Sequence, residues 1–230
     1  MKLSVVIPVY NEEKTIRKVI TNLRRVRLPC KAELIIVDDG STDKTKDEIK
    51  KIVEGEKSIR VFTHAINKGK GAAIQTGIKH SSGDYILLHD ADLEYNPRDI
   101  PTLLSAASQR KEEVAVYGSR FLNRSVSIPL LYLIGNKFLT LLTNIMYTTR
   151  LTDMETGYKL LPASLLKKIR LTSNRFDIEP EITIKLIKNS ISILEVPISY
   201  KSRSHLAGKK LTLTDAIGAV KTIFYYKFSQ

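Results

Sequence analysis

The sequence contains a single cysteine, Cys30, no tryptophan and only four histidines in 230 residues. One cysteine cannot form an intramolecular disulfide, and it excludes a cysteine-rich zinc site as well. Two histidines, His89 and His205, lie near motifs described below, but neither has an evident partner that would orient it. We therefore expect no catalytic histidine.

The sequence also lacks a long uninterrupted apolar run. Its longest apolar stretch, residues 128–146, contains five polar residues: Asn136, Lys137, Thr140, Thr143 and Asn144. These make it a poor membrane-spanning helix. The N-terminus enters an apolar strand pattern within a few residues, so we expect no signal peptide, and C-terminal membrane-spanning segments are not expected either. We predict a cytoplasmic protein, peripherally associated with the cytoplasmic face of a membrane.

Acidic residues are scarce relative to basic ones, and the net charge is +13 with a pI near 9.7. Residues 1–120 carry 21 basic and 17 acidic side chains, whereas residues 121–230 carry 16 and 7. The positive excess therefore lies mainly in the C-terminal half. Nucleic acid, an anionic membrane and a phosphorylated substrate are the partners that such a balance favours.

Apolar runs that predict buried strands alternate along the chain with amphipathic helix patterns. The strand patterns cover residues 3–10, 34–37, 59–62, 85–88, 114–120 and 191–200. This alternation predicts an α/β protein with a Rossmann-like, mostly parallel sheet flanked by helices. With 43% apolar residues we expect a single domain, residues 1–230.

An acidic cluster follows the strand pattern at residues 85–88. On a nearly extended chain Asp90, Asp92 and Glu94 would point the same way, and three convergent carboxylates require a cation between them. Mg²⁺ and Mn²⁺ are the hard cations that such oxygens hold together with substrate phosphates. The alternative is an acidic, solvated loop that caps the helix starting at Asn96-Pro97.

Residues 68–71, Lys-Gly-Lys-Gly, resemble a phosphate-binding loop. They lack the spacing of a P-loop, which excludes a P-loop NTPase. Gly71 at a helix start would allow close approach of a pyrophosphate, and the alternative is a flexible turn with two solvated lysines. Acids at residues 177–181 begin another helix and are interpreted as structural.

Four motifs stand in order at predicted strand ends: Ser4-Val5-Val6-Ile7-Pro8-Val9-Tyr10-Asn11-Glu12, Val37-Asp38-Asp39-Gly40-Ser41-Thr42-Asp43, Asn67-Lys68-Gly69-Lys70-Gly71 and Asp90-Ala91-Asp92. Together they resemble family 2 glycosyltransferases, and within that family most of all the dolichyl-phosphate mannose and glucose synthases. The resemblance covers residues 1–120 well and 150–210 more loosely, including a Gly-Tyr segment before a short strand. It implies a GT-A fold, a nucleotide-sugar donor and inversion at the anomeric carbon.

The resemblance also implies roles for single residues. The donor site would contain Pro8, Tyr10, Glu12, Asp39, Gly71, Asp90 and Ala91. The metal, Mg²⁺ or Mn²⁺, would be held by Asp90, Asp92 and Glu94, with Asp92 also catalytic. In the mannose synthases the residue at the last of these positions is often glutamine, so Glu94 leaves the sugar and the metal preference open. Residues 1–120 would form the nucleotide-sugar half and residues 121–230 the acceptor and membrane-interface half.

The basic C-terminal half supplies the expected acceptor site. Arg120 ends the strand pattern at 114–120, and Arg203 and Lys209 lie in a basic loop. The resemblance assigns Arg120 and Arg203 to catalysis and all three to the acceptor phosphate, for which a planar guanidinium is well shaped. The alternatives are a surface salt bridge for Arg120 and a solvated linker for the loop.

Two amphipathic patterns, residues 128–146 and 211–228, suit helices that lie on a bilayer surface. In the first, Asn136, Thr140, Thr143 and Asn144 trace one helical face and apolar residues cover much of the remainder. Core packing or a dimer interface is the alternative interpretation. A small membrane-anchoring subunit is a further expected partner.

These features predict a metal-dependent, inverting glycosyltransferase that moves a hexose from GDP-mannose or UDP-glucose to dolichyl or another polyprenyl phosphate. A phosphate acceptor is already mostly dianionic at neutral pH and needs no general base. A glycosyltransferase acting on a polysaccharide or protein hydroxyl would need one, and Asp153 or Glu155 is the candidate. The other two interpretations of Asp153 and Glu155 are that they orient the sugar or that they cap the turn. The remaining alternative is a basic, non-enzymatic protein that binds membranes or nucleic acid, although no nucleic-acid-binding motif is present.

Overall fold

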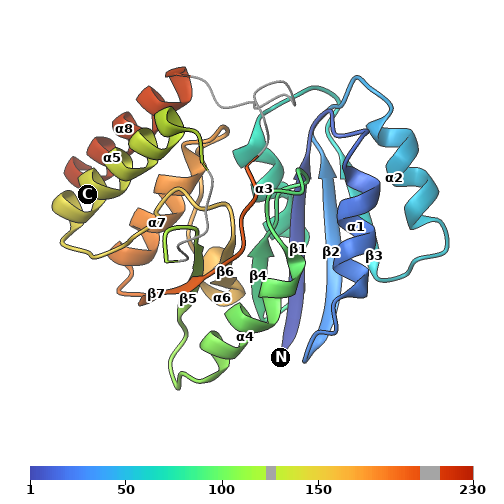
Figure 1. Ribbon diagram of the computed structural model, residues 1–230, viewed down its shortest axis with the longest axis horizontal. Coiled ribbons are helices and arrows are strands. Elements are labelled where there is room, and N and C mark those ends of the chain that lie inside the picture. Colours follow the sequence, from blue (N-terminus) through green and yellow to red (C-terminus); the bar gives the residue numbers. More distant parts are fainter. Residues whose placement is uncertain (123–127, 203–212, 230) are drawn as a thin grey trace.

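The computed structural model describes residues 1–122, 128–202 and 213–229. They form a seven-stranded sheet in the order β3-β2-β1-β4-β6-β5-β7 (Figure 1). The strands are β1 (Lys2–Val9), β2 (Lys31–Asp38), β3 (Ile59–Thr63), β4 (Tyr85–Leu88), β5 (Ala115–Ser119), β6 (Lys159–Pro162) and β7 (Ile193–Pro197). Only the pairings of β6 with β4 and β5 are antiparallel within this described part. The predicted mostly parallel sheet is confirmed.

Helices cover both faces of the sheet (Figure 1). They are α1 (Ile16–Arg25), α2 (Thr45–Val53), α3 (Lys70–His80), α4 (Ile100–Ser108), α5 (Leu130–Tyr147), α6 (Ala163–Leu166), α7 (Ile178–Lys188) and α8 (Leu213–Phe228), with a 3₁₀ turn η1 (Pro97–Asp99) before α4. Leu3, Val5 and Ile7 of β1 pack in one core with α1, α2 and α4. Val6 packs in the other core with α3, α6 and α7. Because both faces are covered, β1 reads as a continuous apolar run.

The short strand that the sequence predicts after the Gly-Tyr segment is β6. The sequence pattern did not indicate that β6 runs antiparallel to its neighbours. The chain leaves β5 at the carboxyl end of the sheet, forms α5 and crosses the same edge through residues 148–158. It therefore re-enters the sheet from that edge and runs down it, opposite to β4 and β5. Residues 148–158 are thereby placed over the ends of the parallel strands.

Helix α5 packs polar residues against the rest of the protein and exposes apolar ones, the opposite of an ordinary surface helix. Its packed side contains Leu139, Thr140 and Thr143, which are at most 6% exposed. The Asn144 side chain holds Leu151 through two hydrogen bonds of 2.8 and 2.9 Å, and the Thr140 hydroxyl accepts from the Met154 amide at 3.1 Å. The polar face predicted from the sequence therefore packs inward and anchors residues 151–154. In the described ranges, no helix combines the length and the apolar character that crossing a membrane requires.

Candidate active site

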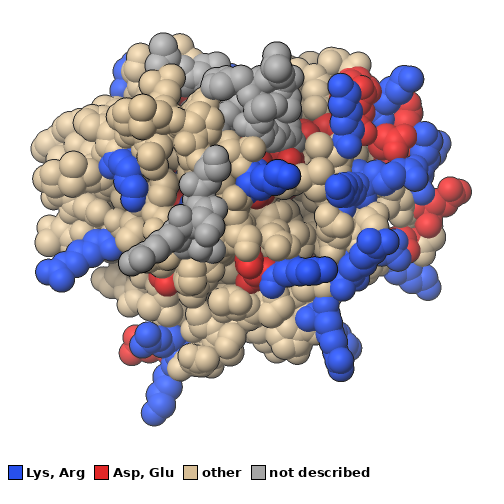
Figure 2. All heavy atoms as spheres, viewed as in Figure 1, with Lys and Arg blue, Asp and Glu red and all other residues tan. Residues whose placement is uncertain are grey.

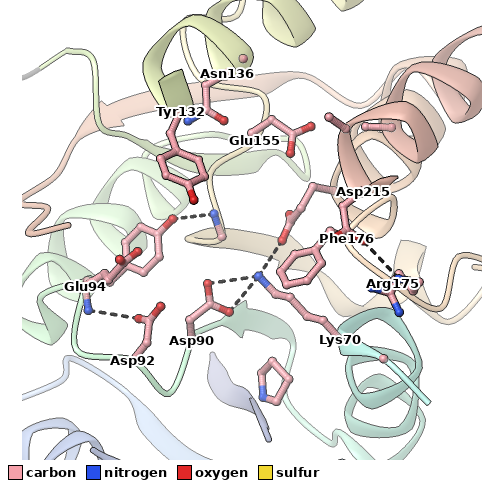
Figure 3. A pocket seen from close by; sticks show the side chains of 18 of the residues that line it. Lys70, Asp90, Asp92, Glu94, Tyr132, Asn136, Glu155, Arg175, Phe176 and Asp215 are labelled. Atoms are coloured by element: carbon pink, nitrogen blue, oxygen red, sulfur yellow. Dashed lines mark hydrogen bonds and ion pairs between the residues drawn. The ribbon is translucent and has the colours of Figure 1, made fainter. Parts of the chain in front are cut away.

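A cavity of about 760 Å³ lies at the carboxyl end of the parallel strands. Residues at or just after the ends of β1, β2, β4 and β5 form its polar wall, namely Tyr10, Asp39, Asp90, Asp92 and Arg120. Side chains of α5 and α8 form its apolar wall, namely Leu131, Ile134, Phe138, Leu139, Ala216 and Ala219. Figure 3 shows Lys70, Asp90, Asp92 and Glu155 around this space. Open α/β sheets bind ligands at this edge.

Six of the seven residues assigned to the donor line the cavity together: Pro8, Tyr10, Glu12, Asp39, Asp90 and Ala91. Asp39 is buried, and both of its carboxylate oxygens accept hydrogen bonds from the protein. Oδ1 accepts from His64 Nδ1 at 2.7 Å and from the Lys68 amide at 3.0 Å, and Oδ2 accepts from the Gly69 amide at 2.7 Å. Asp39 thus fixes the loop before α3 beside the cavity. Its contact with a nucleotide base stays a prediction.

Gly71, which we assigned to close approach of a pyrophosphate, is not among the residues that line the cavity. A Cβ on Gly71 would lie 2.2 Å from the carbonyl oxygen of Ser173 and 2.8 Å from the carbonyl carbon of Asn174. The close approach that requires glycine here is therefore made by the chain's own backbone. The structure brings Gly69 and Lys70 to the cavity instead.

A chain of charged side chains runs from the cavity into the core, and Figure 3 shows Lys70 and Asp90 at its start. Lys70 Nζ lies 2.8 Å from Asp90 Oδ1 and 3.0 Å from Glu179 Oε1, and Glu179 also pairs with the fully buried Lys159. Burial alone would lower the pKa of Lys70, but Asp90 and Glu179 outweigh it and hold that pKa well above its ordinary value. Lys70 is therefore a permanent cation beside Asp90.

The acidic cluster does not keep the extended conformation that we expected of it. Leu93 has a φ of +63°, in the left-handed region that a side chain of its size rarely adopts. The turn is closed by Asp92 Oδ1, which accepts from the Glu94 amide at 3.1 Å. Glu94 accepts a hydrogen bond from the Tyr200 hydroxyl. The side chains of Asp90, Asp92 and Glu94 therefore do not follow the alternation of a strand.

The assignment of Asp90, Asp92 and Glu94 to a metal ion stays a prediction. Among the described residues, no group of three or more His, Cys, Asp and Glu side chains is arranged to hold a metal ion. Asp90 and Asp92 nevertheless both line the cavity at the end of β4. Mg²⁺ and Mn²⁺ are commonly bound through one or two carboxylates plus substrate phosphates, and these two residues fit that requirement.

Arg120 is a buried residue, not part of a surface salt bridge. Its Nε and Nη2 donate to the two oxygens of Asp153, each at 2.7 Å, and its backbone amide donates to Asp153 at 2.9 Å. The guanidinium also lies 5.2 Å from the centre of the Tyr200 ring. Glu195 in turn accepts from the Asp153 amide at 2.9 Å. Arg120 thus reaches the cavity wall already oriented by Asp153.

Glu155, two residues after Asp153, lines the cavity as well. Its Oε1 is buried and has no hydrogen-bond partner within the described part of the chain. Burial raises the pKa of the Glu155 carboxyl to about 7, with Lys159 and Arg120 opposing the rise and Glu179 and Asp153 adding to it. The two candidates for a general base therefore differ, because Asp153 is committed to Arg120 and Glu155 is not.

Two predicted acceptor residues, Arg203 and Lys209, lie outside the described residues. Sequence reasoning did not assign a role to Lys70 or Glu179, although both line the cavity. The signal for Lys70 was the Lys-Gly-Lys-Gly motif, in which we chose the glycine. The signal for Glu179 was weaker, since an acid in the first turn of a helix is explained by the helix dipole alone.

Comparisons with known proteins agree with this geometry. Residues 4–170 match Glycosyl transferase family 2. The chain is 32% identical over 212 residues to the UDP-N-acetylglucosamine–dolichyl-phosphate N-acetylglucosaminyltransferase of Methanococcus voltae, covering 84% of this chain and 83% of the relative. It is 30% identical over 234 residues to the dolichyl-phosphate beta-glucosyltransferase ALG5A of Trichomonas vaginalis, covering 94% of this chain and 69% of the relative.

The fold has a counterpart among solved structures. Glucosyl-3-phosphoglycerate synthase from Mycobacterium tuberculosis, in complex with Mn²⁺, uridine diphosphate and phosphoglyceric acid, superposes with a TM-score of 0.76 at 20% identity. The match covers 100% of this chain and 79% of the synthase. The predicted GT-A fold is thereby confirmed. From its motifs, its fold and the match over residues 4–170, the chain belongs to glycosyl transferase family 2 and is a glycosyltransferase.

Proposed function

We propose that this glycosyltransferase moves a hexose from a nucleotide-sugar, GDP-mannose or UDP-glucose, to the phosphate of a polyprenyl lipid such as dolichyl phosphate, with inversion at the anomeric carbon. The composition of the cavity walls carries the proposal. Charged side chains at the strand ends give way, within one cavity, to apolar side chains of α5 and α8. A polar donor and an isoprenoid acceptor fit such a cavity together. The names of the two dolichyl-phosphate transferases support the same acceptor.

The apolar wall continues into an uncovered apolar surface. Six side chains of α5 are more than half exposed: Leu130, Leu131, Ile134, Phe138, Leu141 and Ile145. Three of them, Leu131, Ile134 and Phe138, also line the cavity. Figure 2 shows few charged side chains over α5 and α8, in contrast to the region of α1 and α2. A continuous apolar path from surface to cavity suits a lipid that enters from a membrane on which this surface rests.

The acceptor phosphate would be bound by Arg120. Asp153 accepts from two of the five N–H donors of the guanidinium, and we propose that the remaining donors bind a phosphate that enters the cavity. A phosphate monoester has its second pKa near about 6, so the nucleophilic oxygen needs no general base at neutral pH. Arg203 and Lys209 are proposed to complete the phosphate site. Arg203→Ala is expected to raise the KM for polyprenyl phosphate more than it lowers kcat.

The proposed metal would be held by Asp92 and Asp90 together with donor phosphates. When bound, Mg²⁺ or Mn²⁺ supplies positive charge that stabilises the diphosphate as it departs. Asp92 would position the donor, and Lys70 would keep a second cation beside Asp90 throughout. Pro8, Tyr10 and Glu12 would hold the nucleoside against the end of β1. A small membrane-anchoring subunit is a further proposed partner, and nucleic acid is not.

The proposal is tested by transfer of labelled sugar into an organic-extractable lipid. Purified protein is incubated with polyprenyl phosphate, Mn²⁺ or Mg²⁺, and a panel of GDP- and UDP-sugars. We expect one donor to label the lipid, and the label to disappear on chelation. If a nucleotide-sugar binds but no donor labels the lipid, the proposed donor is supported and the proposed polyprenyl-phosphate acceptor is refuted.

A further inference from the structure

Glu155 is distinguished among the buried polar groups by its position. Within the described residues, unpartnered buried side-chain atoms occur on Asp38, His89, Glu155 and Glu179. Asp38 and His89 do not line the cavity, and Glu179 Oε1 lies 3.0 Å from the Lys70 ammonium. Glu155 alone in this set faces the cavity without an ion pair or a hydrogen bond. A buried polar atom without a partner costs free energy, so its partner is expected to be a ligand.

The loop that carries Glu155 lies directly over the end of β4. A Cβ on Gly157 would lie 2.5 Å from Asp90 Oδ2 and 3.3 Å from Lys70 Nζ. The Gly157 amide donates to the Tyr95 hydroxyl at 2.8 Å, which fixes the loop at this height. Glu155 therefore borders the cavity on the side of Asp90 that faces the C-terminal half. Glu155 and Asp90 line the same cavity, and Figure 3 shows the Glu155 carboxyl on the side of Asp215 and Phe176.

This placement corresponds to the sugar of a bound donor. If Pro8, Tyr10 and Asp39 border the nucleoside and Asp90 the diphosphate, the next group along the donor meets residues 155–157. We propose that Glu155 is a specificity-determining residue that hydrogen-bonds a hydroxyl group of the transferred sugar. The inference rests on the donor half of the proposed function, a nucleotide-sugar, and not on the acceptor.

The chemistry of a carboxyl group with a raised pKa suits this task. A protonated carboxyl both donates and accepts, as a sugar hydroxyl does, whereas a carboxylate only accepts. A sugar that lacks the matching hydroxyl leaves the buried carboxyl of Glu155 unpaired, and an unpaired buried polar group is a strong basis of discrimination. The replacement Glu155→Gln retains a donor and an acceptor without charge, and Glu155→Met retains the length of the side chain without either. Together these two replacements separate hydrogen bonding from packing.

The test is equilibrium binding by calorimetry in the presence of Mn²⁺, without any acceptor. The probes are GDP-mannose, UDP-glucose and UDP-N-acetylglucosamine, with GDP and UDP as the matching compounds without sugar. We expect E155M to weaken binding of the preferred nucleotide-sugar by about ten-fold or more, and E155Q by about three-fold. Binding of GDP and UDP should change by less than about two-fold in both. Glu112→Gln, the same replacement at an exposed glutamate, is the matched control.

Three results would overturn the inference. The first is a nucleotide-sugar affinity that is unchanged in both variants. The second is an equal loss for GDP or UDP, which would place Glu155 at the nucleotide or in the fold. The third comes from a separate transfer assay with a hydroxyl acceptor: a lost kcat with intact binding of the nucleotide-sugar would identify a general base. If the binding results are as expected but no lipid is labelled, the proposed acceptor fails and the role of Glu155 stands.

Discussion

The N-terminal and C-terminal halves of the chain place polar and apolar side chains in opposite ways. Helix α1 buries Ile16, Val19 and Ile20 against the sheet and exposes Arg24 and Arg25. Helix α5 buries Thr140 and Thr143 and exposes a row of leucine, isoleucine and phenylalanine side chains. The ion pairs also differ, since Arg17–Glu48 lies on the surface within the N-terminal half, whereas Arg120–Asp153, whose carboxylate belongs to the C-terminal half, is buried. The N-terminal half thus combines a charged outer helix with the polar wall of the cavity, whereas the C-terminal half has an apolar outer helix that borders the same cavity.

The largest expected effect concerns the edge where the halves meet. Asp92→Ala removes a proposed metal ligand, and a bound divalent ion stabilises a departing diphosphate by several kcal/mol. We expect sugar transfer to fall by about 10³-fold, with the melting temperature nearly unchanged, because Asp92 lies at the cavity rather than in the core. Initial rates at saturating donor measure this. Chelation of the wild-type protein should match the variant, and a D92A enzyme that remains sensitive to chelation would locate the metal elsewhere.

A pair of arginine variants tests the contrast between buried and surface ion pairs. Arg120→Ala leaves the carboxylate of Asp153 buried and uncompensated, which costs about 3–5 kcal/mol in the free energy of unfolding. Arg17→Ala removes a partner that is 60% exposed, and is expected to cost less than about 1 kcal/mol. Urea denaturation of both variants measures the difference. Equal costs would mean that the two halves do not differ in this respect.

The protonation of Glu155 is expected to make the stability of the protein depend on pH. Its pKa is about 7 in the folded protein against an ordinary 4.5, with burial as the main cause. Between pH 4.5 and pH 7 the Glu155 carboxyl is ionised in the unfolded chain but still protonated in the folded protein. The free energy of unfolding therefore falls as the pH rises through this range, by about 3 kcal/mol in total, and levels off above pH 7. E155Q has no proton to release at this position.

The stability of E155Q relative to the wild-type protein should therefore increase from pH 5 to pH 8. Denaturation curves at four pH values measure it, with E112Q as the flat control. The groups facing Glu155, namely Lys159, Glu179, Arg120 and Asp153, are present in every protein compared. A difference between E155Q and wild type that does not change with pH would show that Glu155 is ionised throughout.

The smallest effect on the fold is expected on the exposed side of α5. Ile134→Ser with Leu141→Ser replaces two side chains that are 58% and 57% exposed. We expect a change below about 1 kcal/mol in the free energy of unfolding, because neither side chain is in the core. Binding to vesicles should weaken by about ten-fold or more, measured by sedimentation. Lys18→Ser on the exposed face of α1 is the control, and equal vesicle binding by the two variants would contradict the membrane assignment.

The sequence predicted the strands well because burial on both faces leaves a local mark, as in the apolar run of β1. It also placed the polar residues at the strand ends, since parallel strands share one edge. The turn at Leu93 could not be predicted, because a leucine with positive φ has no local signal. The partners of Arg120 and Lys70 could not be predicted either, since Asp153 and Glu179 come from distant segments. The antiparallel direction of β6 could not be predicted either, because it depends on the path of the chain through distant segments.

In the proposed function, one cavity joins a nucleotide-sugar to a lipid phosphate. The most direct measurement offers the labelled donor to polyprenyl phosphate, to the matching polyprenol and to a water-soluble phosphate monoester, and determines the anomeric configuration of the product by NMR. The proposed function predicts label in the polyprenyl phosphate far above the other two, with the configuration inverted. Equal labelling of the polyprenol, or a product with retained configuration, would contradict it.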